Sequence, residues 1–146
     1  MDERYLFRGK AKRIPKTEKA RKRNGIDGQG FVYGAYSDKC RTGSELMRAI
    51  YAYSEYAGCC NWVEILPKTV GQCTGLKDKN GKLIFEGDIL QDGQEKGKVK
   101  WLQGGWWVDC VIGGDDIGEF PMCDLERFEI IGNIYDNPEL LTEGHK

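Results

Sequence analysis

The chain has 146 residues, of which 40% are hydrophobic and 31% are charged, and its formal net charge is −1. This length suits one domain with a core of its own, and no apolar run approaches the ~20 residues of a membrane-spanning helix, which argues against an integral membrane protein. The charged N-terminus differs from the apolar start of a signal peptide, so a cytoplasmic location is expected.

The charge is unevenly distributed along the chain. Residues 1–24 carry ten Lys and Arg against three Asp and Glu, a net charge of +7, whereas the remaining residues sum to −8. Such a basic stretch is either a solvated loop on the chain's own acidic surface or an arm that binds phosphates. In the second case seven side chains are candidates for binding nucleic acid: Lys12, Arg13, Lys16, Lys19, Arg21, Lys22 and Arg23.

The first third of the chain predicts short strands around a basic loop. Residues 3–9 can form a short strand, and residues 10–30, which contain Pro15 and several glycines without apolar periodicity, are expected to form a loop. Residues 31–37 are β-branched and aromatic, which is typical of a strand.

Residues 44–57 fit two structures. Thr42 followed by Glu45 matches a capping box, which favours a helix. Alternatively, Met47, Ala49, Tyr51 and Tyr53 would share one face of a strand. We expect the helix, followed by strands at residues 62–66 and 69–76.

From Gly75 onward, turn signals separate short strands. Asn80-Gly81 supplies the positive φ that a tight hairpin requires, and Glu86-Gly87-Asp88 forms a second turn. A loop is expected at residues 113–116, and a single helical turn after Pro138. Strands are predicted at residues 83–85, 89–90, 98–102, 106–112 and 128–135.

Strands of this length and spacing predict a mainly β protein built as a small antiparallel barrel, with N-terminal strand additions and room for one short helix. Residues 1–66 would hold the N-terminal strands and the basic loop within the same globular unit. Residues 67–141 would form the barrel core, and residues 142–146 a tail.

The residues of a catalytic centre are sparse. His145 is the only histidine and lies near the end of the chain, so a nucleophile activated by histidine is not expected. The six cysteines contain no C-x-x-C pair and are expected to be buried free thiols. We therefore expect no enzyme, no cofactor and no metal site.

Three tryptophans are the candidate residues for binding a partner: Trp101, Trp106 and Trp107. They cluster across a predicted hairpin, in which Trp106 and Trp107 must face opposite sides of their strand. One of these two is expected in the core together with Trp101. The other would be exposed and available to a peptide or a base.

Two runs of sequence are distinctive, TVGQCTGLKDKNGKLIFEGDIL at residues 69–90 and FEIIGNIYDNPELL at residues 128–141. These two runs resemble the signatures of the YopX family, a family of small proteins found in bacteriophages and prophages. Residues 5–9 resemble the family's opening strand, and residues 97–101 and 106–108 match its paired strands more loosely.

This resemblance implies a mostly β protein with an SH3-like or related barrel, encoded in a mobile element and acting in the bacterial cytoplasm. It implies no catalytic activity. The recurring residues are expected to serve turns and close packing: Gly75, Asn80, Gly81, Gly87, Asp88 and Gly132.

The expected function is that of a non-catalytic accessory protein that binds a host or phage protein. The alternative is a nucleic-acid-binding accessory protein that uses residues 10–23. No membrane partner is expected, and open strand edges would allow a homo-oligomer.

Overall fold

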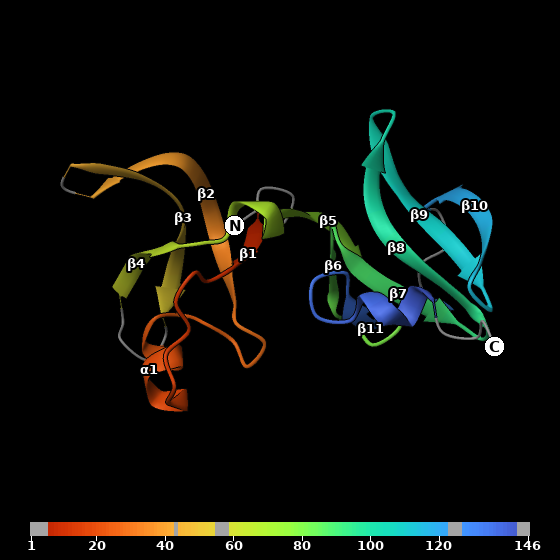
Figure 1. The fold of residues 1–146 in the computed structure, drawn as a ribbon, viewed down its shortest axis with the longest axis horizontal. Coiled ribbons are helices and arrows are strands. Elements are labelled where there is room, and N and C mark those ends of the chain that lie inside the picture. Colours follow the sequence, from red (N-terminus) through yellow and green to blue (C-terminus); the bar gives the residue numbers. More distant parts are fainter. Residues whose placement is uncertain (1–5, 43, 55–58, 123–126, 143–146) are drawn as a thin grey trace. The chain divides into compact units, whose positions relative to one another are not determined.

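The computed structural model describes residues 6–42, 44–54, 59–122 and 127–142 (Figure 1). Antiparallel strands dominate these residues, which confirms the predicted mainly β class. The chain divides into two compact units, Met1–Gln72 and Cys73–Lys146, called here the N-terminal and C-terminal units. The predicted division after residue 66, with both parts in one globular unit, stays a prediction.

The N-terminal unit contains an antiparallel sheet in the order β4-β3-β2-β1. The first residues of β5 pair with β1, at Phe7↔Gln72 and Arg8↔Gly71. The strands are β1 (Phe7–Lys10), β2 (Phe31–Thr42), β3 (Glu45–Ser54) and β4 (Cys59–Glu64). The core on one face of this sheet consists of Ala11, Ile26, Val32, Ile50, Ala52 and Ile65.

The helix expected at residues 44–57 is wrong, because β3 occupies this segment as far as Ser54. The two residues of the apparent capping box, Thr42 and Glu45, instead face each other across the turn between β2 and β3. Both neighbours of β3 are strands, so ladder hydrogen bonds on two sides outweigh the local helical signal. Ile50 is fully buried while Tyr51 is exposed, as the alternation of a strand requires.

The loop expected at residues 10–30 is also wrong in part, because it contains the short helix α1 (Glu18–Arg23). Thr17 begins this helix, and its hydroxyl accepts a hydrogen bond from the backbone N–H of Ala20 at 3.2 Å. An ion pair of 2.8 Å between Glu18 and Lys22 joins successive turns. The strand predicted for residues 3–9 is found at β1, and residues 3–5 lie outside the described residues.

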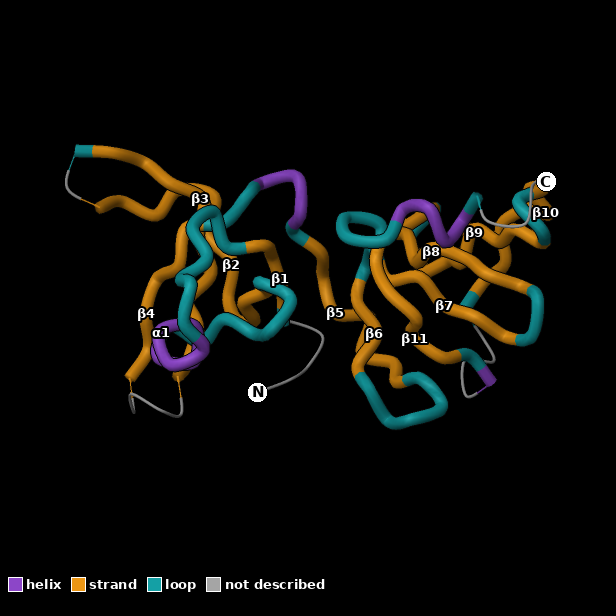
Figure 2. Tube along the Cα trace, turned by 60° about the horizontal axis from the view of Figure 1, so that its bottom comes forward, coloured by secondary structure: helices purple, strands orange, loops and turns teal. Residues whose placement is uncertain are grey.

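The C-terminal unit contains a five-stranded antiparallel sheet in the order β10-β9-β8-β7-β11 (Figure 2). From Cys73 onward, β5 pairs with β6. Two 3-10 turns, Pro67–Thr69 and Pro138–Leu141, precede and follow these strands. The strands are β5 (Gly71–Lys77), β6 (Leu83–Phe85), β7 (Asp88–Asp92), β8 (Glu95–Leu102), β9 (Gly105–Ile112), β10 (Asp115–Pro121) and β11 (Glu129–Asn133).

One strand of this unit, β10, was not predicted. The loop expected at residues 113–116 is only a two-residue turn, in which Gly113 and Gly114 have φ of 58° and 89°. Two consecutive positive φ values are typical of a tight β-hairpin. Nearly every residue of β10 is exposed, so its sequence lacks the alternation that indicates a strand.

The core of the C-terminal unit lies on one face of its sheet and consists of Ile84, Leu90, Val99, Val108, Cys110 and Phe128. Val99 and Val108 face each other across β8 and β9, as the alternation of these strands demands. Neither strand order closes on itself, so the predicted SH3-like barrel is not confirmed.

Candidate functional site

The hairpin of β8 and β9 carries an exposed aromatic pair. Trp101 and Trp106 are directly paired across the two strands. Their ring centroids are 4.9 Å apart and the rings meet edge to face at 76°. Trp106 is half-buried and packs against the core of the C-terminal unit, whereas Trp101 is 54% exposed. The expectation that Trp101 lies in the core is therefore wrong.

Trp101 is exposed because β7 ends before it could pair with the last residues of β8. The ladder between β7 and β8 ends at Ile89↔Lys98, and one further hydrogen bond joins Gly87 N–H to the carbonyl of Val99 at 2.9 Å. The last residues of β8 continue past this point together with β9, as the long hairpin in Figure 1 shows. Trp101 thus stands on the core-facing side of the hairpin, beyond the part that the core covers.

A third aromatic side chain extends this surface on β10. Phe120 pairs with Val108, so it shares the face of Trp106, and it is 47% exposed. We call Trp101, Trp106 and Phe120 the hairpin aromatic surface. Flat apolar rings of this kind suit the side chains of a protein partner, since aromatic residues contribute large contact area at little cost in conformational entropy.

Trp107 lies on the opposite face of β9 and does not belong to this surface. It pairs with Lys100 on β8 and with Pro121 on β10. Ion pairs cover this outer face: Lys100 contacts Glu119 and lies 3.8 Å from Asp109. The hydrogen bond to Glu119 raises the pKa of Lys100 above its usual range despite some desolvation. The surroundings of Trp107 are therefore charged rather than apolar.

The seven candidate nucleic-acid-binding residues of the basic segment, residues 10–23, fall into two groups. Three of them make contacts within the unit. Lys12 lies 3.0 Å from Glu64, Lys22 pairs with Glu18, and the Arg21 guanidinium donates to the carbonyls of Pro15 and Lys16 at 3.2 and 3.1 Å. The other four are exposed and make no ion pair with any described residue: Arg13, Lys16, Lys19 and Arg23.

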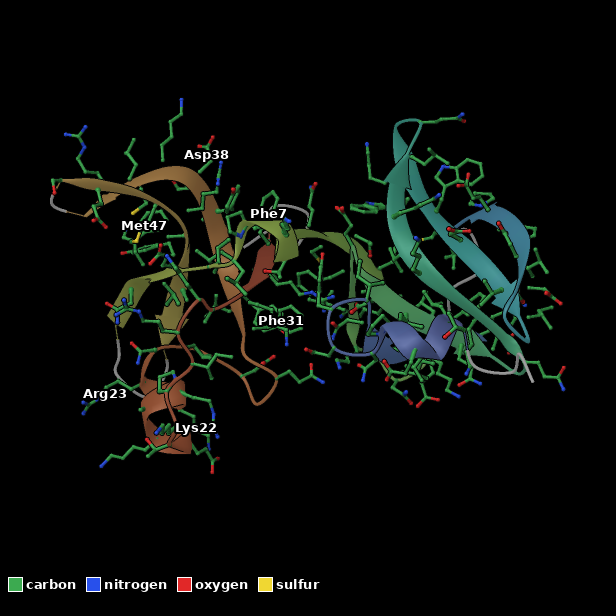
Figure 3. The ribbon with its side chains drawn as sticks, viewed as in Figure 1. Phe7, Lys22, Arg23, Phe31, Asp38 and Met47 are labelled. Carbon is green, nitrogen blue, oxygen red and sulfur yellow. The ribbon has the colours of Figure 1, made fainter. Side chains whose placement is uncertain are left out.

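The charges of the two units have opposite signs. The N-terminal unit has fourteen Lys and Arg against eight Asp and Glu, a net charge of +6. The C-terminal unit has eight against fifteen, a net charge of −7. Figure 3 shows Lys22 and Arg23 on α1, which belongs to the positive unit. The near-neutral whole chain therefore contains a cationic and an anionic surface.

A shallow cavity of about 410 Å³ lies at the opposite end of the hairpin from the two paired tryptophans. Half of its lining residues lie in two turns and half at the adjoining ends of strands: Gly93, Gln94, Gly113 and Gly114 in the turns, and Gln91, Lys96, Val111 and Ile112 in β7, β8 and β9. Asp115 and Asp116 begin β10 next to it, and Asp116 accepts a hydrogen bond from the backbone of Gly118 at 2.8 Å. Within the described ranges, no three His, Cys, Asp or Glu side chains are grouped to hold a metal ion.

Of the predicted turn residues, Asn80, Gly81 and Gly87 lie in turns of the C-terminal unit, whereas Gly75, Asp88 and Gly132 lie in the strands β5, β7 and β11. Gly75, Gly81 and Gly87 have positive φ, between 79° and 89°. Asp88 is buried and accepts a hydrogen bond from the backbone N–H of Phe85 at 2.8 Å. A Cβ on Gly132 would lie only 2.5 Å from the side chain of Asn137.

Asp78 organises the hairpin that contains Asn80, and sequence reasoning missed its role. One carboxylate oxygen accepts the backbone N–H groups of Asn80 and Lys82, each at 2.9 Å. The other accepts the N–H of Ile130 on β11 at 3.1 Å. An Asp two residues before Asn-Gly is a local signal for the first two bonds. The third bond depends on tertiary structure.

Two cysteines are buried thiols, as expected. Cys73 and Cys110 are free and about 1% exposed, and Cys40 is free and half-buried. Burial, reinforced by the charge of Glu95, raises the pKa of Cys110 to about 12. The side chains of Cys59 and Cys60 and the whole of Cys123 lie outside the described residues.

Comparisons with known proteins identify a family and similarity to a solved structure. The family model described as YopX protein matches residues 16–142. The crystal structure of protein EF1440 from Enterococcus faecalis is 23% identical in sequence, and the alignment covers 73% of this chain and 86% of that chain with a TM-score of 0.41. No curated protein matches the chain. Among the described residues, no helix is long and apolar enough to span a membrane.

Proposed function

The chain belongs to the YopX family, and from this premise we propose that it is a non-catalytic binding module that acts on a protein through the hairpin aromatic surface. We further propose that it is an accessory protein of a bacteriophage or prophage, and that it acts on a host or phage protein in the bacterial cytoplasm. The single observation that carries the proposal is the exposure of Trp101 beside Trp106 and Phe120.

The chemistry of this surface supports a protein partner. An exposed tryptophan contributes apolar area that water solvates poorly, and tryptophans are frequent among the residues that dominate binding energy in protein interfaces. Trp106 packs on the core, so its ring is held in place and supports the ring of Trp101. The pair is therefore organised before binding, which limits the entropy lost on association.

The strand next to this surface offers a second mode of contact. β10 ends the strand order of its sheet, and no described strand pairs with its outer edge, which could therefore accept an added strand. On its inner side, a bulge between Asp116 and Gly118 interrupts the ladder that joins β10 to β9. A partner segment that pairs with residues 118–121 would lie beside Phe120. The same edge is the place where a second copy of the chain could pair.

Affinity capture from lysate of a bacterial host tests the proposed function. The bait proteins are the full chain, Trp101→Ser and Trp62→Ser, the last being a matched control because Trp62 is also exposed but lies in the N-terminal unit. We expect a protein that the full chain and Trp62→Ser retain from nuclease-treated lysate and that Trp101→Ser loses. Equal capture by all three baits would overturn the assignment of the surface.

Binding of nucleic acid by the basic segment is a second candidate function. It is favoured by the four exposed cations on and around α1, in a unit of net charge +6. Each phosphate contact releases counterions, so binding should weaken steeply with salt. Replacing these four cations by Gln should flatten that dependence. Binding to labelled DNA that does not change with salt would count against this function.

A further inference from the structure

The N-terminal unit carries an aromatic pair of its own, away from the residues that the sequence singled out. Tyr51 on β3 pairs directly with Trp62 on β4. Their ring centroids are 4.9 Å apart with an interplanar angle of 41°, and each residue is 44% exposed. Their neighbours Ile50 and Val63 face the core, so the pair lies on the opposite face of the sheet.

The basic segment begins close to this pair. Glu64 follows Trp62 by two residues on the same face of β4, and its carboxylate lies 3.0 Å from the Lys12 ammonium. Ala11 belongs to the core, and Lys12 is exposed on the other side. In both Figure 1 and Figure 2, α1 lies beside β4. Cations therefore flank the edge strand that carries Trp62.

Charge indicates what such a surface would attract. The unit has a net charge of +6, and its exposed cations Arg13, Lys16, Lys19 and Arg23 lie in the same segment as Lys12. The ion pair between Lys12 and Glu64 is itself solvent-exposed, and such pairs contribute little to stability. A phosphate can therefore compete with Glu64 for Lys12. An aromatic pair bordered by cations suits a ligand with both flat rings and phosphates.

We propose that Tyr51 and Trp62 form a platform on which bases of single-stranded nucleic acid stack, while the backbone phosphates contact the basic segment. This inference rests on the second candidate function and specifies its ligand. In a duplex the faces of the bases are covered by their neighbours, whereas an unpaired strand can lay a base on an aromatic ring. The basic segment attracts either form, and the platform selects the single strand.

Fluorescence anisotropy with the full chain tests the platform. The probes are a labelled dT oligonucleotide of about 15 nucleotides and a labelled duplex of the same length, each in a salt series. Trp62→Leu keeps an apolar side chain but removes the ring, and Trp62→Phe restores a ring. Leu76→Ala is the control, an exposed apolar side chain of the other unit that belongs to neither proposed surface.

The wild-type chain is expected to bind the single strand more tightly than the duplex. Trp62→Leu should lower affinity for the single strand about tenfold, the loss of roughly one stacked base, without changing the salt slope. Trp62→Phe should retain most of the affinity, and Leu76→Ala all of it. If Trp62→Leu acted only by disturbing the fold, it would weaken binding of the duplex as well. An unchanged affinity for the duplex therefore shows that the loss is specific to the ring. Tyr51→Leu repeats the test if circular dichroism shows that Trp62→Leu is unfolded.

The results separate failure of the platform from failure of nucleic-acid binding. Equal, salt-dependent binding of both probes by wild type and Trp62→Leu would overturn the platform and leave the basic segment as a binding site. Failure to bind either probe at low salt would overturn both.

Discussion

Among single residues, Asp78 is a buried carboxylate that joins two parts of the C-terminal unit. It is only 5% exposed, and its two carboxylate oxygens accept three backbone N–H groups that belong to the hairpin and to β11. Burial alone would raise the pKa of Asp78, but the hydrogen bonds from Ile130, Lys82 and Asn80 outweigh it and hold the pKa below its ordinary value of 3.8. The charged carboxylate thus stabilises the folded state.

Asp78→Asn should lower the free energy of unfolding by about 1–3 kcal/mol at pH 7, because an amide cannot accept all three N–H groups. Since the folded-state pKa lies below 3.8, this contribution is present above about pH 4 and fades as the pH falls through the folded-state pKa. Urea unfolding at pH 7 and below pH 3 measures it. The exposed Asp116→Asn is the control, and an equal loss in both variants would contradict the role of Asp78.

Cys110 should be inert in the folded protein. With a pKa of about 12, roughly one thiol in ten thousand is ionised at pH 8, and the thiolate is the reactive form. Pulse labelling with a maleimide followed by peptide mass spectrometry should modify half-buried Cys40 before Cys110, and Cys110 only after unfolding in denaturant. Rapid labelling of native Cys110 would show that its surroundings are open to solvent.

Among the elements, the β8–β9 hairpin carries one tryptophan that packs on the core, Trp106, and one that is exposed, Trp101. Trp106 packs against the core cluster, whereas Trp101 is exposed and packs against the ring of Trp106. Trp106→Ala should therefore destabilise the protein by about 2–4 kcal/mol. Trp101→Ala should cost no more than about 1 kcal/mol, the worth of an aromatic pair. Chemical denaturation compares the two, and equal losses would mean that Trp101 is a core residue.

Elements with local signals could be predicted from the sequence, and elements defined by pairing could not. Asn80-Gly81 and Gly87 mark turns by their own backbone requirements, so the strands between them were found. In β3, by contrast, local signals favoured a helix, and only pairing with β2 and β4 makes it a strand.

The same limit applies to the candidate sites. The cluster of Trp101 and Trp106 could be predicted, because a short turn joins their strands and fixes which residues face each other. The pair of Tyr51 and Trp62 could not, since it depends on recognising β3 and on its register with β4. The exposure of Trp101 depends on where β7 ends, which no local signal shows.

At the scale of the whole molecule, opposite charges are held in separate units. A net charge of −1 would suggest weak interactions with any charged polymer, but charges of +6 and −7 are each large enough to act alone. The N-terminal unit is thus suited to a polyanion despite the acidic pI of the chain, about 5.9.

This separation predicts that the full chain binds both heparin and an anion exchanger at pH 7 and low salt. Replacing Arg13, Lys16, Lys19 and Arg23 by Gln should abolish retention on heparin and strengthen retention on the anion exchanger. Elution at increasing salt measures both effects. Failure of the wild-type chain to bind heparin would show that its own carboxylates neutralise the basic segment.

Hydrogen–deuterium exchange of the full chain, free and bound to the captured protein, tests the proposed function most directly. Amides of residues 101–107 and 117–121 should gain protection in the complex, because they carry the hairpin aromatic surface and the edge of β10. Residues 12–23 should exchange as in the free chain. Protection confined to the N-terminal unit, with the hairpin unchanged, would contradict the hairpin aromatic surface as the site of protein binding.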